Sequence, residues 1–146
     1  LKGYIKPHIK YLNSGIKTLI ITLTVLVSIT AQAQVKPPKN TSKVVQVMDS
    51  NAFNTCYKFL IEKGYTIDQA DRDLGLIKTA MSDRFQITVN ILDTIAYFSA
   101  SFEFVAPYSG STSIMKACWC GLAGDYRRRY FKRLLAMFEG VEYTFR

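Results

Sequence analysis

The alternation of polar and apolar residues after residue 42 first predicts a short strand and a helix. Residues 43–48 (KVVQVM) are rich in β-branched side chains, as is typical of a strand. Apolar residues then recur at the i, i+3, i+4 and i+7 spacing of one helix face, namely Phe53, Cys56, Tyr57 and Leu60. Asp49 or Ser50 is suited to cap this helix, and Gly64 follows where a left-handed C-terminal cap would lie.

The middle of the chain shows the period of two that predicts strands. Residues 65–70 and 74–80 flank Asp71-Arg72-Asp73, whose carboxylates favour a tight turn. Apolar and polar residues alternate along residues 85–91, and after a turn they alternate again along residues 95–106. Because the connections are short, we expect these strands to pair antiparallel with their neighbours.

The C-terminal part contains the most clearly amphipathic segment. Residues 114–120 fit either a further strand or the start of a helical region, and Asp125 is then a suitable helix N-cap. One half of the following helix is apolar or aromatic, with Tyr126, Tyr130, Phe131, Leu134, Leu135, Met137 and Phe138. The other half carries Arg128, Arg129, Lys132 and Arg133, and only Arg127 breaks the pattern. Residues 141–146 are expected to form a short strand or a tail.

These elements predict an α+β fold in the order β-α-β-β-β-β-α. Two amphipathic helices would cover one face of an antiparallel sheet of four to five strands, and the other face could stay in contact with water. We expect residues 43–146 to form a single domain. Residues 34–42 are polar and contain a Pro-Pro pair, which predicts a flexible leader.

The N-terminal segment predicts export. Four lysines and no acidic residue precede an apolar run of thirteen residues, and Ala31-Gln32-Ala33 matches a signal peptidase site. Such a run spans about 20 Å as a helix, against roughly 30 Å for the core of a bilayer. We therefore expect residues 1–33 to be a cleaved secretory signal rather than a permanent transmembrane anchor. The product would be periplasmic or secreted.

Removal of this signal would change the chemistry of the chain. The net charge would fall from +8 to +4, because fifteen basic and eleven acidic residues remain. Five of the basic residues lie between Arg127 and Arg133, so the rest of the domain is nearly neutral, and we expect no nucleic-acid binding. His8, the only histidine, would also be lost, which excludes histidine-dependent catalysis and histidine-ligated metals. We expect a non-enzymatic domain with no cofactor and no metal.

Three cysteines remain in the exported chain. Cys118 and Cys120 are too close in sequence to bridge each other easily if their segment is extended. One interpretation is a disulfide from Cys56 to Cys118 or to Cys120, and the alternative is that Cys56 is a small apolar core residue. A zinc site of three thiolates would lack a fourth ligand.

One segment resembles a known family. Residues 52–79 include Leu60, the run Gly64-Tyr65-Thr66-Ile67, the turn Asp71-Arg72-Asp73, Gly75, Ile77 and Thr79. This pattern resembles the repeated domain of the outer-membrane assembly lipoprotein BamC and similar small bacterial envelope domains. The resemblance implies a helix-grip fold, without catalysis, that is used for protein contacts in the envelope.

Two groups of residues are candidate sites. The cluster Arg127, Arg128, Arg129, Lys132 and Arg133 could bind an anionic surface or an acidic partner, or it could be a solvated helix face. The row Phe98, Phe102 and Phe104 could line an apolar pocket, or it could be ordinary core. We therefore expect an exported non-enzymatic envelope domain that contacts an envelope protein or an anionic surface. The alternative is a carrier of a small apolar ligand held between the sheet and the helices.

Overall fold

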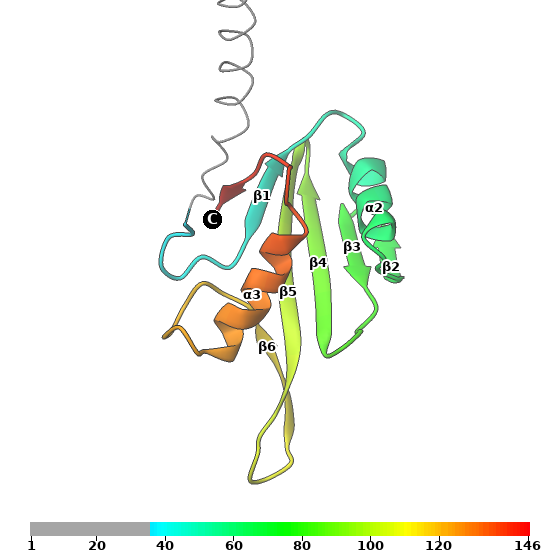
Figure 1. Cartoon of the computed structure of the whole chain (residues 1–146). Coiled ribbons are helices and arrows are strands. Elements are labelled where there is room, and N and C mark those ends of the chain that lie inside the picture. The colour runs from blue at the N-terminus through cyan, green and yellow to red at the C-terminus, as the bar shows by residue number, and fades with distance from the viewer. Residues whose placement is uncertain (1–35) are drawn as a thin grey trace, which may run out of the picture. The chain divides into compact units, whose positions relative to one another are not determined.

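Seven strands and two helices are formed by residues 36–146, the part of the chain that the computed structural model describes (Figure 1). In chain order they are β1 (Val44–Val47), α2 (Ala52–Glu62), β2 (Ile67–Asp71), β3 (Leu76–Thr79), β4 (Phe85–Leu92), β5 (Ile95–Val105), β6 (Thr112–Lys116), α3 (Tyr126–Ala136) and β7 (Thr144–Phe145). The α+β fold class is thereby confirmed. The predicted signal, residues 1–33, lies outside the described residues.

The strands form one open antiparallel sheet in the order β2-β3-β4-β5-β1-β7, and β6 pairs with β5 outside this path. β4 covers one edge of β5 along its length. On the other edge β1 pairs with the first half, where Val44 faces Phe98, and β6 pairs with the second half, where Lys116 faces Ser101. The β5–β6 hairpin consequently extends beyond the other strands (Figure 1).

The sheet has seven strands within the described residues, whereas the sequence predicts four to five. β6 overlaps the first part of residues 114–120, which fit either a strand or the start of a helical region, and begins two residues earlier; β7 lies in the predicted strand or tail. Both are short edge strands whose side chains are mostly exposed. Their apolar period is therefore weak, because little of their surface faces the core.

Both helices pack on the same face of the sheet. Phe59 of α2 and Phe98 of β5 each lie against Phe138, just after α3, with ring centroids 5.5 and 4.9 Å apart. Buried residues of the two helices and four strands form a single core. The opposite face of β4 and β5 carries half-exposed polar residues such as Thr88 and Ser99. The predicted division into a covered face and a wet face is thus present.

The helix and hairpin that carry the family resemblance are formed as expected. α2 ends beside Gly64, whose φ of +84° is in the left-handed region, and the Asp71 carboxylate accepts a hydrogen bond from the Leu74 N–H at 3.0 Å. Two details of the predicted helix differ. Its N-cap is Asn51, without a side-chain capping hydrogen bond, rather than Asp49 or Ser50. Tyr57 is 39% exposed, and Phe59 instead packs against the core, because the buried stripe of α2 runs through Ala52, Cys56 and Leu60.

Residues 37–42 of the predicted flexible leader are ordered. Residues from Pro37 onward belong to the same compact unit as the rest of the domain. Pro37 and Thr41 are buried, and Thr41 forms an antiparallel bridge with Trp119. Ser42 donates a backbone hydrogen bond to the Arg146 carbonyl. This segment has no apolar period because main-chain hydrogen bonds, rather than a buried side-chain face, hold it in place.

Candidate functional site

The candidate site lies at the N-terminal end of α3, where the chain turns from β6 into the helix. Asp125 caps α3: its carboxylate accepts a hydrogen bond from the Arg127 N–H at 2.8 Å. Gly121 makes room for this carboxylate, since a Cβ at this position would overlap it and since its φ is +70°. The turn from Gly121 to Asp125 thereby brings Trp119, which lies just before it, beside α3.

Trp119 is half-buried, and both its backbone carbonyl and its backbone N–H are hydrogen-bonded. Its carbonyl accepts a hydrogen bond from the Asn40 N–H at 3.0 Å, and its own N–H donates to the Thr41 carbonyl at 2.6 Å. Arg128 stacks on the indole, with its guanidinium carbon 4.0 Å from the ring centroid, and the Lys132 ammonium is 6.0 Å from the same point. Two cations from one side of α3 therefore surround a fixed aromatic ring.

The predicted basic cluster divides into two groups. Arg127 pairs with Asp125 at 2.7 Å, and Arg133 lies 3.6 Å from Asp83 and stacks on the Phe85 ring. The other three residues have no carboxylate within ion-pair distance among residues 36–146, and we call them the α3 cationic face: Arg128, Arg129 and Lys132. Arg129 and Lys132 are exposed, and the Nε of Arg128 is buried without a hydrogen-bond partner in the described part of the chain.

The pairing of Arg127 explains why it interrupts the apolar half of the helix. Its side chain and its backbone N–H both donate to Asp125, and these hydrogen bonds hold the pKa of the Asp125 carboxyl below its ordinary value. The same contact raises the pKa of the Arg127 guanidinium. Arg127 therefore works as part of the helix cap, and its charge is balanced locally.

The predicted phenylalanine row is packed as core. Phe98 contacts Phe59 and Phe138, and Phe102 stacks on Tyr130. The third ring, Phe104, is half-buried and lies against the exposed Tyr126, with centroids 5.8 Å apart. Aromatic rings from the helices and their flanks thus occupy the space that an apolar ligand would need beside this row.

The predicted disulfide is also corrected. Cys118 and Cys120 are bonded to each other, with Cα atoms 5.2 Å apart, and Cys56 is a buried free thiol whose sulfur lies 3.3 Å from that of Met48. The prediction assumed an extended segment, in which Cα atoms two residues apart are separated by about 7 Å. β6 has ended by Lys116, and the separation of 5.2 Å shows that the backbone between the two cysteines is not fully extended.

A shallow depression of about 410 Å³, which no sequence pattern predicts, lies at another end of the sheet. The β2–β3 turn, the β4–β5 turn and the start of α2 form its walls, and its lining includes Phe53, Arg72, Leu74 and Leu92. Arg72 donates to the Asn54 side chain at 2.5 Å and stacks on Phe53. The lining also includes the carboxylates of Asp73 and Asp93.

Two further features, a metal cluster and a membrane-spanning helix, can be assessed for residues 36–146. No group of three or more cysteine, histidine, aspartate and glutamate side chains is arranged to hold a metal ion within that range. No helix in that range has the length and apolar character needed to cross a membrane. In comparisons with known proteins, no family model matches the chain, and neither a curated protein nor a solved structure shows significant similarity to it.

Proposed function

We propose that this chain is an exported, non-enzymatic envelope domain that binds an anionic membrane surface through the α3 cationic face and Trp119. The observation that carries the proposal is the stacking of Arg128 on Trp119, with Lys132 beside the same ring. Tryptophan flanked by basic residues is typical of proteins that lie at a membrane interface. The chemistry recognised would be the phosphate of lipid headgroups.

The charge pattern favours an extended anionic lipid surface over a partner that carries a single acidic group. Arg129 and Lys132 are exposed, and no carboxylate among residues 36–146 balances them. Each basic residue near an anionic membrane contributes about 1 kcal/mol, so three contribute roughly a hundredfold in binding. This attraction is screened over a Debye length of about 8 Å at physiological salt, so binding should weaken as salt increases.

The fold supports a binding role of this kind. The two helices leave one face of the sheet uncovered, and the site lies on the outer side of α3 rather than in a closed cavity. The resemblance of residues 52–79 to the BamC domain points to the same class of non-catalytic envelope protein. On this proposal, the N-terminal signal delivers the domain to the periplasm or the exterior.

Vesicle sedimentation tests the proposal. Protein from residue 34 onward is mixed with vesicles of phosphatidylcholine alone or with added phosphatidylglycerol, at low and high salt. The test variant carries Arg128→Gln, Arg129→Gln and Lys132→Gln. The matched control loses the same charge elsewhere, through Lys58→Gln, Lys63→Gln and Arg84→Gln, all of which are exposed.

We expect the wild type and the control to bind anionic vesicles in a salt-sensitive way, and the test variant to bind about a hundredfold more weakly. Trp119 is the only tryptophan, so its fluorescence reports directly from the site. Equal binding by the two variants would place any contact elsewhere on the domain. Failure of the wild type to bind anionic vesicles would refute a lipid surface as the partner.

A further inference from the structure

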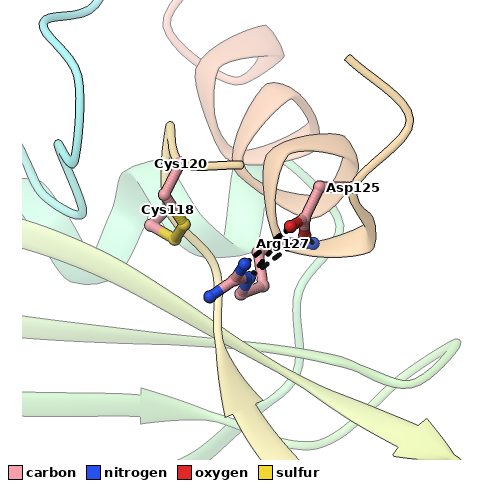
Figure 2. The surroundings of a disulfide bond; sticks show 4 residues. All are labelled: Cys118, Cys120, Asp125 and Arg127. Atoms are coloured by element: carbon pink, nitrogen blue, oxygen red, sulfur yellow. Dashed lines mark hydrogen bonds and ion pairs between the residues drawn. A yellow bond between two sulfur atoms is a disulfide. The ribbon is translucent and has the colours of Figure 1, made fainter. Parts of the chain in front are cut away.

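A second feature of the same loop is the disulfide between Cys118 and Cys120. Both cysteines are half-buried near the surface, whereas Cys56 is enclosed in the core. Figure 2 shows the pair next to the first turn of α3, with the Arg127 side chain lying between the disulfide and Asp125. The disulfide therefore lies where another molecule can reach it.

The fold does not depend on this bond to hold the segment. Ala117 donates a backbone hydrogen bond to Ala100 at 2.9 Å, and Cys118 donates one to the Arg127 carbonyl at 3.2 Å. Trp119 is fixed on both sides by the segment before β1, as described above. A disulfide stabilises a fold mainly by closing a long loop, and a bridge across one intervening residue closes the shortest loop available. Stabilisation of the fold is thus a weak explanation for the presence of this disulfide.

A cation and a helix end lie beside the pair. Figure 2 shows the Arg127 side chain next to the disulfide, while its guanidinium is also paired with Asp125. The pair also lies beside the N-terminal end of the helix, where the backbone dipole favours negative charge. Cations and helix N-termini lower the pKa of cysteine thiols, and stabilisation of the reduced form makes a disulfide more oxidising.

From this arrangement we infer that the Cys118–Cys120 disulfide accepts electrons from dithiols of other exported polypeptides. A substrate thiolate attacks one sulfur of the pair, which forms a mixed disulfide and releases the other sulfur as a thiolate beside Arg127. The second substrate thiol loses its proton and attacks the mixed bond. The substrate leaves as a disulfide, and its two electrons remain on Cys118 and Cys120. The protons of the two substrate thiols pass to water, and water protonates the reduced pair according to pH. No histidine is required for this exchange.

A single-turnover assay tests the inference. Oxidised full-length mature protein is mixed with a reduced peptide that contains two cysteines, and mass spectrometry follows the peptide disulfide. We expect one equivalent of peptide to be oxidised by the wild type and by Cys56→Ala, and none by the double variant Cys118→Ser, Cys120→Ser. The rate should exceed that of the same concentration of oxidised glutathione by about tenfold or more, as expected for a poised disulfide.

The role of Arg127 is tested separately as a positioning residue. In reduced protein, ultraviolet thiolate absorbance should titrate at higher pH in Arg127→Gln than in the wild type, while Lys58→Gln leaves the titration unchanged. This readout does not require the double cysteine variant to fold. The inference is overturned if the wild type oxidises the peptide no faster than glutathione does, or if Arg127→Gln leaves the thiolate titration unmoved. Neither result bears on vesicle binding.

Discussion

Phe102 of β5 stacks on Tyr130 of α3, with ring centroids 4.2 Å apart and an angle of 13° between the ring planes. Phe102 is almost fully buried, at 1% exposure, and it lies on the covered face of the longest strand. Tyr130 follows Arg129 in the helix, so this contact fixes the rotation of α3 about its axis. The core therefore determines which way the cationic face points.

The first prediction concerns this aromatic contact. Replacement Phe102→Ala removes a fully buried ring and its partner contact, so the free energy of unfolding should fall by about 3–5 kcal/mol. Urea denaturation followed by circular dichroism measures the change. Tyr108→Ala, which alters a fully exposed tyrosine in the β5–β6 hairpin, should change it by less than about 0.5 kcal/mol. Similar losses in both variants would contradict the described core.

The second prediction is a pH dependence that arises from the α3 cap. The pKa of Asp125 is lowered in the folded state, mainly by hydrogen bonds from Arg127. Its carboxylate therefore stabilises the fold above the unfolded-state pKa of about 3.9, and this stabilisation is lost as pH falls through the lower folded value. Asp125→Asn retains a capping side chain without the charge.

Thermal unfolding of the wild type and of Asp125→Asn, compared from about pH 7 to about pH 2, tests this linkage. We expect the wild type to have the higher midpoint at neutral pH, and the two midpoints to converge as the medium becomes more acidic. A difference that stays constant over the whole range would show that the charge on Asp125 does not contribute.

The third prediction counts thiols. Cys56 is the one cysteine outside the disulfide, and burial raises its pKa to about 12. In native protein it should resist alkylation at neutral pH, because the thiolate is the reactive form. Intact mass should show one alkylation after denaturation without reductant and three after reduction. Three alkylations without reductant would exclude any disulfide. A peptide map in which Cys118 or Cys120, rather than Cys56, carries the single alkylation would support the bridge to Cys56 instead.

Periodic segments of this chain could be interpreted from the sequence because one physical cause determines each of them. The alternation along residues 85–91 and 95–106 comes from burial of one sheet face, and β4 and β5 follow it closely. Asp125 caps α3 as predicted, since a cap is a contact between residues two apart in sequence. The turn at Asp71 was predicted for the same reason, because its carboxylate contacts the N–H of Leu74, only three residues away.

Short or irregular segments were harder to interpret because contacts distant in sequence decide them. β6 is a strand because β5 extends beyond β1 and leaves an edge to pair with. Residues 37–42 are ordered because Trp119 and Arg146 accept or donate hydrogen bonds there. Neither cause leaves a periodic trace in the segment itself, so a flexible leader and an ambiguous region were the natural predictions.

Local periodicity and charge along the chain were enough to predict the α+β class, the two amphipathic helices on one sheet face and the concentration of positive charge on the second helix. The folded chain was needed to show that Arg127 and Arg133 are paired while Arg128 stacks on Trp119, and that Cys118 bonds to Cys120. The contacts of Arg128 and of the cysteines depend on the loop after β6, which long-range hydrogen bonds hold in place. The contact of Arg133 depends on the β3–β4 connection, which brings Asp83 beside α3.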